Sequence, residues 1–139
     1  MIVLDSNVVS ATISLRPDEA VVRWLDRQLS DSVWLTSITV FEIRFGFETL
    51  ARGRKRAHLE SLFEGLLRQD IEGRILPFDE AAAEAAAQFA ARRREKGRPV
   101  AFRDVEIAGI VVARGATLAT RNVRDFEDIE LDIVNPWEP

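Results

Sequence analysis

The stretch Met1-Ile2-Val3-Leu4-Asp5-Ser6-Asn7 predicts how this chain folds. Ile2-Val3-Leu4 is a short continuous apolar run, which is typical of a strand that is buried on both faces. The run stops at Asp5-Ser6-Asn7, three residue types that favour turns and helix starts. The sequence therefore predicts a buried strand that ends in a polar corner.

The same order, an apolar strand followed by an amphipathic helix, returns along the chain. Val33-Trp34-Leu35 precedes a helical pattern over residues 40–50, and Ile75-Leu76 precedes an alanine-rich helix over residues 80–95. Further helices are expected over residues 18–29, 54–68 and 102–115, and further strands over residues 117–120 and 132–136. Strands that alternate with helices predict an α/β fold with a parallel sheet covered on both faces.

The length of 139 residues predicts a single domain, residues 1–139. No apolar run approaches the roughly 20 residues that a membrane span requires. The N-terminal residues lack the basic region and the long apolar stretch of a signal peptide. We therefore expect a cytoplasmic protein with no membrane partner.

The composition excludes several chemistries. The chain has no Cys and one His, His58, so thiol nucleophiles, thiolate metal sites and clusters of several histidines are impossible. An enzyme with this composition is expected to work with carboxylates, which suit hard cations such as Mg²⁺ or Mn²⁺. The net charge of −4 argues against a nucleic-acid partner. The acids crowd the last fifteen residues, however, so the charge distribution still permits RNA.

Three acidic residues stand where an α/β site is expected, and each has a purely structural alternative. Asp5 follows the first strand and could cap the next helix. Glu42 lies in an apolar stretch, and Thr39 to Glu42 also fits a capping box, provided that the helix starts at Thr39 and not at Ser37. Asp104 lies at the start of a helix, where it could simply complement the helix dipole.

Taken together, the three acids predict a metal site. Ligands of such sheets bind beyond the carboxyl ends of the strands, at the point where the strand order reverses. Carboxylates that converge there repel one another unless a cation neutralises them. A bound divalent ion could then lower the pKa of a water molecule and stabilise charge on a phosphoryl oxygen. Asn122 and Asp125, after the penultimate strand, are candidates for a fourth position, although Asn122 could instead cap a short helix.

The sequence resembles the PIN-domain family, and within it the VapC and FitB type toxins of bacterial toxin–antitoxin pairs. The resemblance spans essentially the whole chain. It is carried by five stretches in order: residues 2–10 (IVLDSNVVS), 35–46 (LTSITVFEIRFG), 103–108 (RDVEIA), 116–126 (ATLATRNVRDF) and 135–137 (NPW).

The resemblance implies a three-layer α/β/α sandwich with a five-stranded, mainly parallel sheet. It also implies a Mg²⁺- or Mn²⁺-dependent endoribonuclease that cleaves structured RNA, tRNA or rRNA, and so inhibits translation. Asp5, Glu42 and Asp104 are the acids that it assigns to catalysis and to the metal. Asn7, Ser37 and Thr120 match supporting polar positions. Asn122 stands where many PIN domains have a fourth acid, which leaves open whether Asp125 takes that role.

The resemblance implies partners as well. VapC and FitB type toxins form homodimers, and each is silenced by an antitoxin with a DNA-binding half, so DNA would be reached only through the antitoxin. The antitoxin's tail usually enters the acidic cleft, often with an arginine. The charges support this arrangement, because a guanidinium neutralises the same carboxylates that a metal would.

Two basic runs are candidates for contacts with RNA phosphates. They lie at residues 52–56 and 92–98. The candidates within them are Arg52, Arg54, Lys55, Arg56, Arg93 and Arg98. Such contacts would give affinity without sequence information. The alternative is that both runs are solvated helix ends, where basic residues favour the helix dipole.

Three other functions compete with a nuclease. A haloacid-dehalogenase-like phosphatase needs a second Asp two residues after the first, where this chain has Asn7. A phosphoryl-accepting receiver domain needs a Lys near its last strands, but the only lysines are Lys55 and Lys96. A catalytically weak PIN fold that only binds RNA or an antitoxin is disfavoured by the presence of all three acids.

Overall fold

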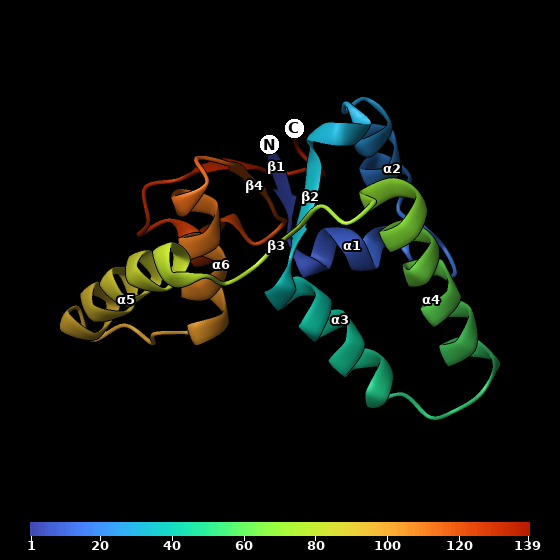
Figure 1. Ribbon diagram of the computed structural model, residues 1–139, viewed down its shortest axis with the longest axis horizontal. Coiled ribbons are helices and arrows are strands. Elements are labelled where there is room, and N and C mark those ends of the chain that lie inside the picture. The colour runs from blue at the N-terminus through green and yellow to red at the C-terminus, as the bar shows by residue number, and fades with distance from the viewer.

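A computed structural model describes residues 1–139 and shows alternating strands and helices (Figure 1). The strands are β1 (Ile2–Leu4), β2 (Val33–Thr36), β3 (Ile75–Leu76), β4 (Thr117–Ala119) and β5 (Asp132–Val134). The helices are α1 (Ser6–Thr12), α2 (Glu19–Asp26), α3 (Ser37–Glu48), α4 (Arg54–Gly65), α5 (Glu80–Glu95) and α6 (Phe102–Ala113). Shorter helical turns are η1 (Ser30–Ser32), η2 (Leu66–Ile71) and η3 (Val123–Phe126).

The five strands form one parallel sheet in the order β3-β2-β1-β4-β5. The order reverses between β1 and β4, because β2 and β3 extend from one side of β1 while β4 and β5 extend from the other. The polar corner at Asp5 follows β1, and Thr120 follows β4. Asp5 and Thr120 therefore lie at the switch point, where ligand sites of such sheets form.

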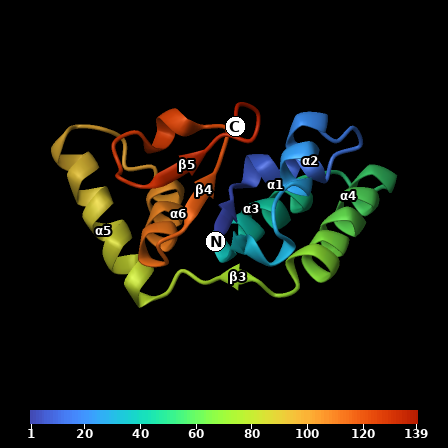
Figure 2. The same cartoon turned by 90° about the horizontal axis from the view of Figure 1, so that it is seen from above.

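Helices cover both faces of the sheet, which confirms the predicted three layers (Figure 2). Neighbouring residues of a strand point to opposite faces. In β1, Val3 packs with the core under α5 and α6, while Leu4 packs with the core under α1 to α4. The same alternation holds in β4 for Leu118 and Ala119. The short apolar strands are buried on both sides, as their sequence indicates.

The predicted helices form with small shifts at their ends. The helix expected over residues 18–29 ends at Asp26, because the backbone turns back there: Gln28 N–H donates to the Leu25 carbonyl at 2.9 Å. The helix expected over residues 54–68 instead runs on, through the π-helical turn η2, to Ile71. No helix is long and apolar enough to span a membrane.

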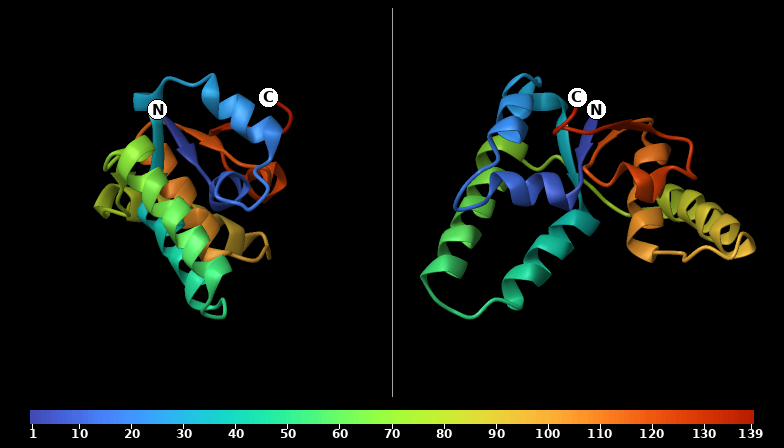
Figure 3. Two further views of the ribbon diagram at one scale, coloured as in Figure 1. Left: turned by 90° about the vertical axis from the view of Figure 1, so that its right-hand side faces the viewer. Right: turned by 180° about the vertical axis from the view of Figure 1, so that it is seen from behind.

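Helices α3 and α4 project together away from the sheet and are joined at their far ends by residues 49–53 (Figure 3). On the opposite face, α5 and α6 pack closely, and a glycine makes this possible. A Cβ atom on Gly109 of α6 would lie only 2.9 Å from the Ala86 Cβ of α5 and would overlap the Ala82 carbonyl. Gly109 therefore sets the distance between the two helices.

Candidate functional site

Three acidic side chains, Asp5, Glu42 and Asp104, bind the guanidinium of Arg103. Nη2 of Arg103 donates to Asp5 Oδ1, Nε donates to Glu42 Oε2, and Nη1 donates to Asp104 Oδ1 at 2.9 Å. The acids come from the end of β1, from α3 and from the first turn of α6. The structure thus brings the three predicted acids together, around an arginine to which the sequence analysis gave no role.

Asp5 is fully buried and is held by its neighbours. It caps α1, because its Oδ1 accepts a hydrogen bond from the Ser6 N–H at 2.8 Å. Its Oδ2 accepts from Thr120 Oγ1 at 2.8 Å and from Asn7 Nδ2 at 3.3 Å. Asp5 therefore caps α1 and also belongs to the cluster of three acids. Thr120 and Asn7 hold its carboxylate in place.

Glu42 is not part of a capping box. Helix α3 begins at Ser37, and its N-cap is Thr36, whose Oγ1 accepts from the Thr39 N–H at 3.0 Å. Glu42 thus lies in the second turn, where its carboxylate reaches Arg103 instead of a helix end. Its other oxygen, Oε1, is buried and has no hydrogen-bond partner. An unpaired buried acceptor costs free energy unless a ligand satisfies it.

Burial and neighbouring charges shift two pKa values in this cluster. Burial raises the pKa of Asp104, an effect that the Arg103 guanidinium partly offsets and that the charge of Asp125 reinforces. Burial by itself would lower the pKa of Arg103, but its hydrogen bond to Glu42 and the charge of Asp5 raise it above its ordinary value. Asp5, Glu42 and Asp104 face the Arg103 guanidinium, and Arg93 also reaches Asp104 Oδ2 at 4.0 Å. The formal charges of these five groups sum to −1, from −3 + 2.

The remaining predicted polar residues lie around the acids without joining them. The Ser37 hydroxyl accepts from the Phe78 N–H at 3.3 Å, beyond β3, and forms no hydrogen bond with the acids. Asn122 is exposed, and only its backbone N–H makes a contact here, with Thr120 Oγ1 at 3.1 Å. Asp125 is also exposed and acts on the cluster through its charge. The Asn122 side chain therefore makes no hydrogen bond to the acids.

Arg93 is a correction to the predicted RNA contacts. Its side chain is 1 % exposed and binds both carboxylate oxygens of Asp128, at 2.8 and 2.9 Å. Its remaining donors bind the backbone carbonyls of Val100 and Asp125 at 2.9 and 2.6 Å. The prediction was wrong because a basic run on a helix has one side that faces the core. Arg93 holds α5 to the segments before and after α6.

The other basic candidates differ in their surroundings. Arg56 forms ion pairs with Glu60 at 2.7 Å and with Glu48 at 3.1 Å, which hold it on the surface of α4. Arg98 pairs with Asp128 at 3.7 Å. Arg52, Arg54 and Lys55 are exposed at the start of α4.

The acidic cluster has the donors that a divalent cation requires. The side chains of the cluster offer carboxylate oxygens, which Mg²⁺ and Mn²⁺ prefer as ligands. One of these oxygens, Glu42 Oε1, has no hydrogen-bond partner in the chain. As the side chains stand, no three acids are close enough to hold an ion, because the Arg103 guanidinium lies between them. The three carboxylates therefore suit a cation, and in this structure the Arg103 guanidinium binds to them.

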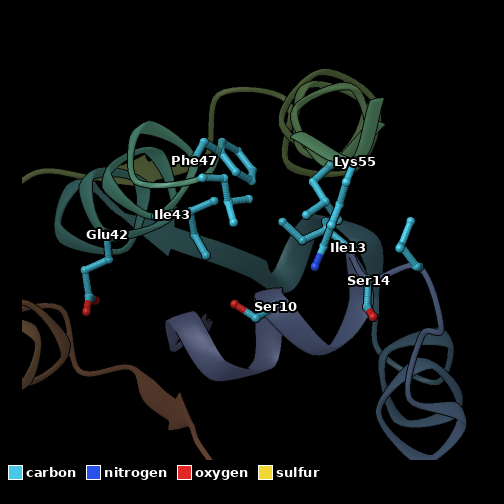
Figure 4. A pocket seen from close by; sticks show the side chains of 11 residues that line it. Ser10, Ile13, Ser14, Glu42, Ile43, Phe47 and Lys55 are labelled. Carbon is cyan, nitrogen blue, oxygen red and sulfur yellow. The ribbon is translucent and has the colours of Figure 1, made fainter. Parts of the chain in front are cut away.

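A pocket adjoins the cluster between α1, α3 and α4 (Figure 4). Its walls are mainly apolar, with Ile13, Ile43 and Phe47 among the side chains that line it. Glu42 stands at one end, and the Lys55 side chain points from α4 toward α1. An apolar groove thus leads to the carboxylates.

The fold agrees with a comparison against protein families. Residues 2–131 match the PIN domain. The chain belongs to the PIN domain family. This PIN domain is 40% identical over 139 residues to "VapC ribonuclease Y4jK" of Sinorhizobium fredii, covering 100% of this chain and 99% of that protein. It is 32% identical over 135 residues to "tRNA(fMet)-specific endonuclease VapC" of Salmonella typhimurium, covering 96% of each chain.

A solved structure matches the PIN domain along its whole length. "Structure of FitAB bound to IR36 DNA fragment" superposes with a TM-score of 0.89 at 37% identity, covering 100% of this chain and 97% of that one. The predicted VapC/FitB-like PIN family is confirmed. This membership excludes the phosphatase and receiver-domain alternatives.

Proposed function

We propose that this PIN domain is a metal-dependent endoribonuclease and the toxin of a toxin–antitoxin pair. The observation that carries the proposal is the convergence of Asp5, Glu42 and Asp104 at the switch point of the sheet, with a net negative charge. The relatives named as ribonucleases support it. The name of the Salmonella relative favours tRNA as substrate, with rRNA as the second RNA to test.

Asp5, Glu42 and Asp104 are the residues that would hold Mg²⁺ or Mn²⁺. A divalent ion at this place supplies an activated water and stabilises negative charge on the phosphoryl oxygen. Asp5 offers a carboxylate whose direction is fixed by Thr120 and Asn7, and Glu42 offers its unpaired Oε1. Arg103 must leave the three carboxylates to make room, so its side chain has to move before catalysis.

Cleavage of RNA by the purified protein tests this proposal. We expect tRNA to be cut in the presence of Mn²⁺ or Mg²⁺ and left intact in excess chelator. The variant Asp104→Asn should lose at least about 100-fold in rate, because it removes a charged ligand, while it keeps the fold. Glu84→Gln is the matched control, since Glu84 is exposed on α5 and forms no ion pair.

Two results would contradict the proposal. One is cleavage by Asp104→Asn at the wild-type rate, which would remove the acid cluster from catalysis. The other is a wild-type protein that binds RNA but never cuts tRNA or rRNA with either metal. That second result would favour the catalytically weak, RNA-binding PIN fold.

An antitoxin is the proposed protein partner. The similar FitAB structure is a complex by its title, and the groove of Figure 4 offers an apolar path to the carboxylates. Gly46 lines this groove, and a Cβ atom added there would have no neighbouring atom within 4 Å. Gly46→Leu should therefore fill the groove without disturbing the fold. It should weaken capture of the protein encoded next to this gene at least tenfold and leave RNA cleavage intact; unchanged capture would contradict the proposed groove.

A homodimer is the proposed assembly. Phe41 and Phe45 stack on α3 with ring centroids 6.1 Å apart, yet remain 67 % and 60 % exposed, and Phe102 is 70 % exposed. Exposed apolar side chains of this size mark contact surfaces. Sedimentation should show a dimer for the wild type and a monomer for the Phe41→Ser, Phe45→Ser double variant. A monomeric wild type would contradict the assembly.

A further inference from the structure

A second pocket lies on the other side of Asn7 from the carboxylates. It has a volume of about 330 Å³, and its lining includes Arg16, Asp18, Arg121 and Trp137. The Asn7 side chain joins it to the acidic cluster: Nδ2 donates to Asp5, and Oδ1 accepts from the Arg121 N–H at 3.2 Å. The Asn7 side chain therefore separates the pocket from the acidic cluster.

Arg121 is positioned by an aromatic ring. Its guanidinium carbon lies 4.9 Å from the centre of the Trp137 ring, a distance at which a cation and a ring attract each other. Trp137 is itself fixed, because its indole N–H donates to Asp18 Oδ2 at 2.9 Å. Stacking of this kind limits the motion of the guanidinium and lowers the entropy lost when it binds a ligand.

Asp18 forms no ion pair with this arginine, although the Arg121 charge contributes to the lowering of the Asp18 pKa. Its Oδ1 caps α2 by accepting from the Ala20 N–H at 3.0 Å, and its Oδ2 is taken by Trp137. The Trp137 hydrogen bond is the main reason why the pKa of Asp18 lies below its ordinary value. The carboxylate is thus ionised and already committed to donors within the chain.

Arg16 and Arg121 have no ionic partner within 4.0 Å, and neither guanidinium donates a hydrogen bond to the chain. Arg93 and Arg103, by contrast, donate hydrogen bonds to carboxylates within the chain. Two arginines and one aspartate give the pocket a net charge of +1, from +2 − 1. The donors are therefore available to an anion from outside the chain.

We propose that Arg121 and Arg16 bind a phosphate of the RNA strand next to the phosphate that is cut. This inference rests on the proposed nuclease function and adds a subsite to it. An RNA with one phosphate at the acidic cluster has a neighbouring phosphate a short way along the strand, and the cationic pocket lies beside the cluster. A guanidinium matches phosphate oxygens with two parallel hydrogen bonds, which a stacked arginine can offer without rearranging. The contact gives affinity and register and carries no base specificity.

Binding of fluorescently labelled oligouridylate to the full chain, in chelator at several salt concentrations, tests the subsite. Each lost phosphate contact should reduce the slope of log K against log salt by about 0.7 for a single strand. We expect Arg121→Gln to weaken binding about three- to tenfold and to reduce the slope by that amount. Arg16→Gln should act in the same direction. Arg121→Lys should keep the slope and still bind more weakly, because it retains the charge and loses the two-pronged contact.

Arg23→Gln is the matched control. Arg23 is an exposed arginine on α2, its contact with Glu19 is long at 3.8 Å, and it lies outside the pocket lining. Its loss should change neither affinity nor slope, although it removes the same unit of charge. In cleavage assays with Mn²⁺, Arg121→Gln should raise KM and leave kcat within about twofold.

The outcomes separate the subsite from the nuclease. If the wild type binds and cuts RNA while Arg121→Gln matches it in affinity, slope and KM, the subsite is wrong and the nuclease stands. If Arg23→Gln weakens binding as much as Arg121→Gln, the effect is general charge and the subsite is again wrong. If the wild type neither binds nor cuts RNA, the nuclease proposal fails and the subsite fails with it.

Discussion

Arg93 and Arg103 lie only ten positions apart, on α5 and α6, and both bind carboxylates, yet their surroundings differ. Arg93 is buried with one carboxylate, Asp128, that takes two of its hydrogen bonds, and two backbone carbonyls take the others. Arg103 is about one third exposed and faces three carboxylates. The first set pairs a buried guanidinium with one principal acid, with a longer contact of 4.0 Å to Asp104, whereas the second places three carboxylates on one guanidinium and has negative charge in excess.

This difference separates a structural ion pair from a binding site. A neutral, fully hydrogen-bonded pair in the interior has no capacity for another ligand, and breaking it is costly. A cluster with excess negative charge at the edge of a sheet has capacity for a cation, and its arginine is one cation among those that could bind.

Removal of the Arg93 side chain should have the largest effect on stability. Arg93→Ala leaves the largely buried Asp128 with only its longer contact to Arg98, at 3.7 Å, and it removes the donors of two backbone carbonyls. We expect a loss of about 3–5 kcal/mol in the free energy of unfolding, measured by urea denaturation. Arg92→Ala, at an exposed neighbour on the same helix, should change it by less than about 0.5 kcal/mol. Equal losses for the two variants would refute the structural role of Arg93.

Separation of α5 from α6 should have an intermediate effect. Gly109→Ala places a methyl group against Ala86 and the Ala82 carbonyl, so the helices must move apart. Overpacking of this kind costs about 1–3 kcal/mol in the free energy of unfolding. Mn²⁺ affinity, measured on the same variant, should change less than twofold, because Asp5 and Glu42 lie outside the α5–α6 contact and Asp104 lies more than one turn before Gly109 on α6. A large loss of affinity would mean that the two arginine regions are not independent.

Low pH should reduce the stability contributed by the Arg93–Asp128 pair. We expect a smaller change in the free energy of unfolding than for Arg93→Ala or Gly109→Ala. The hydrogen bond from Arg93 holds the pKa of Asp128 below its ordinary value, in spite of its burial. The stability that this shift contributes is fully present above the ordinary Asp pKa, near 3.9, and is lost as the pH falls through the lower folded value. One such proton changes the free energy of unfolding by at most about 1.4 kcal/mol per pH unit.

Urea denaturation between pH 5 and pH 2 measures this dependence. Asp128→Asn should lower stability at pH 5 and flatten the decline on acidification. Glu127→Gln, which replaces an exposed neighbouring acid without an ion pair, should keep the wild-type slope. A slope in Asp128→Asn as steep as in the wild type would show that other acids govern the decline.

Much of the fold could be predicted because its signals are local. Ile2-Val3-Leu4 shows its burial by composition alone, and the polar residues after it mark the carboxyl end of the strand. The three acids could be proposed because they follow strands or begin helices. Whether Glu42 belongs to a cap depended on one helix boundary, and the N-cap at Thr36 decided it.

The arginines could not be predicted because their partners are distant in sequence. Arg103 meets Asp5 across 98 positions and Glu42 across 61, and Arg93 meets Asp128 across 35. The sequence of a basic run does not show which of its residues face the core. For that reason it predicts an RNA contact for Arg93, which is in fact buried. Trp137 and Arg121 are also distant in sequence, and neither residue gives a local signal of their contact.

Calorimetric titration of Mn²⁺ into the metal-free wild type and the Arg103→Gln variant tests the claim that a divalent cation and the Arg103 guanidinium compete for the same three carboxylates. Arg103→Gln should bind Mn²⁺ at least about tenfold more tightly, equivalent to about 1.4 kcal/mol, and Asp104→Asn should bind it more weakly than the wild type. Equal or weaker binding by Arg103→Gln would contradict the claim.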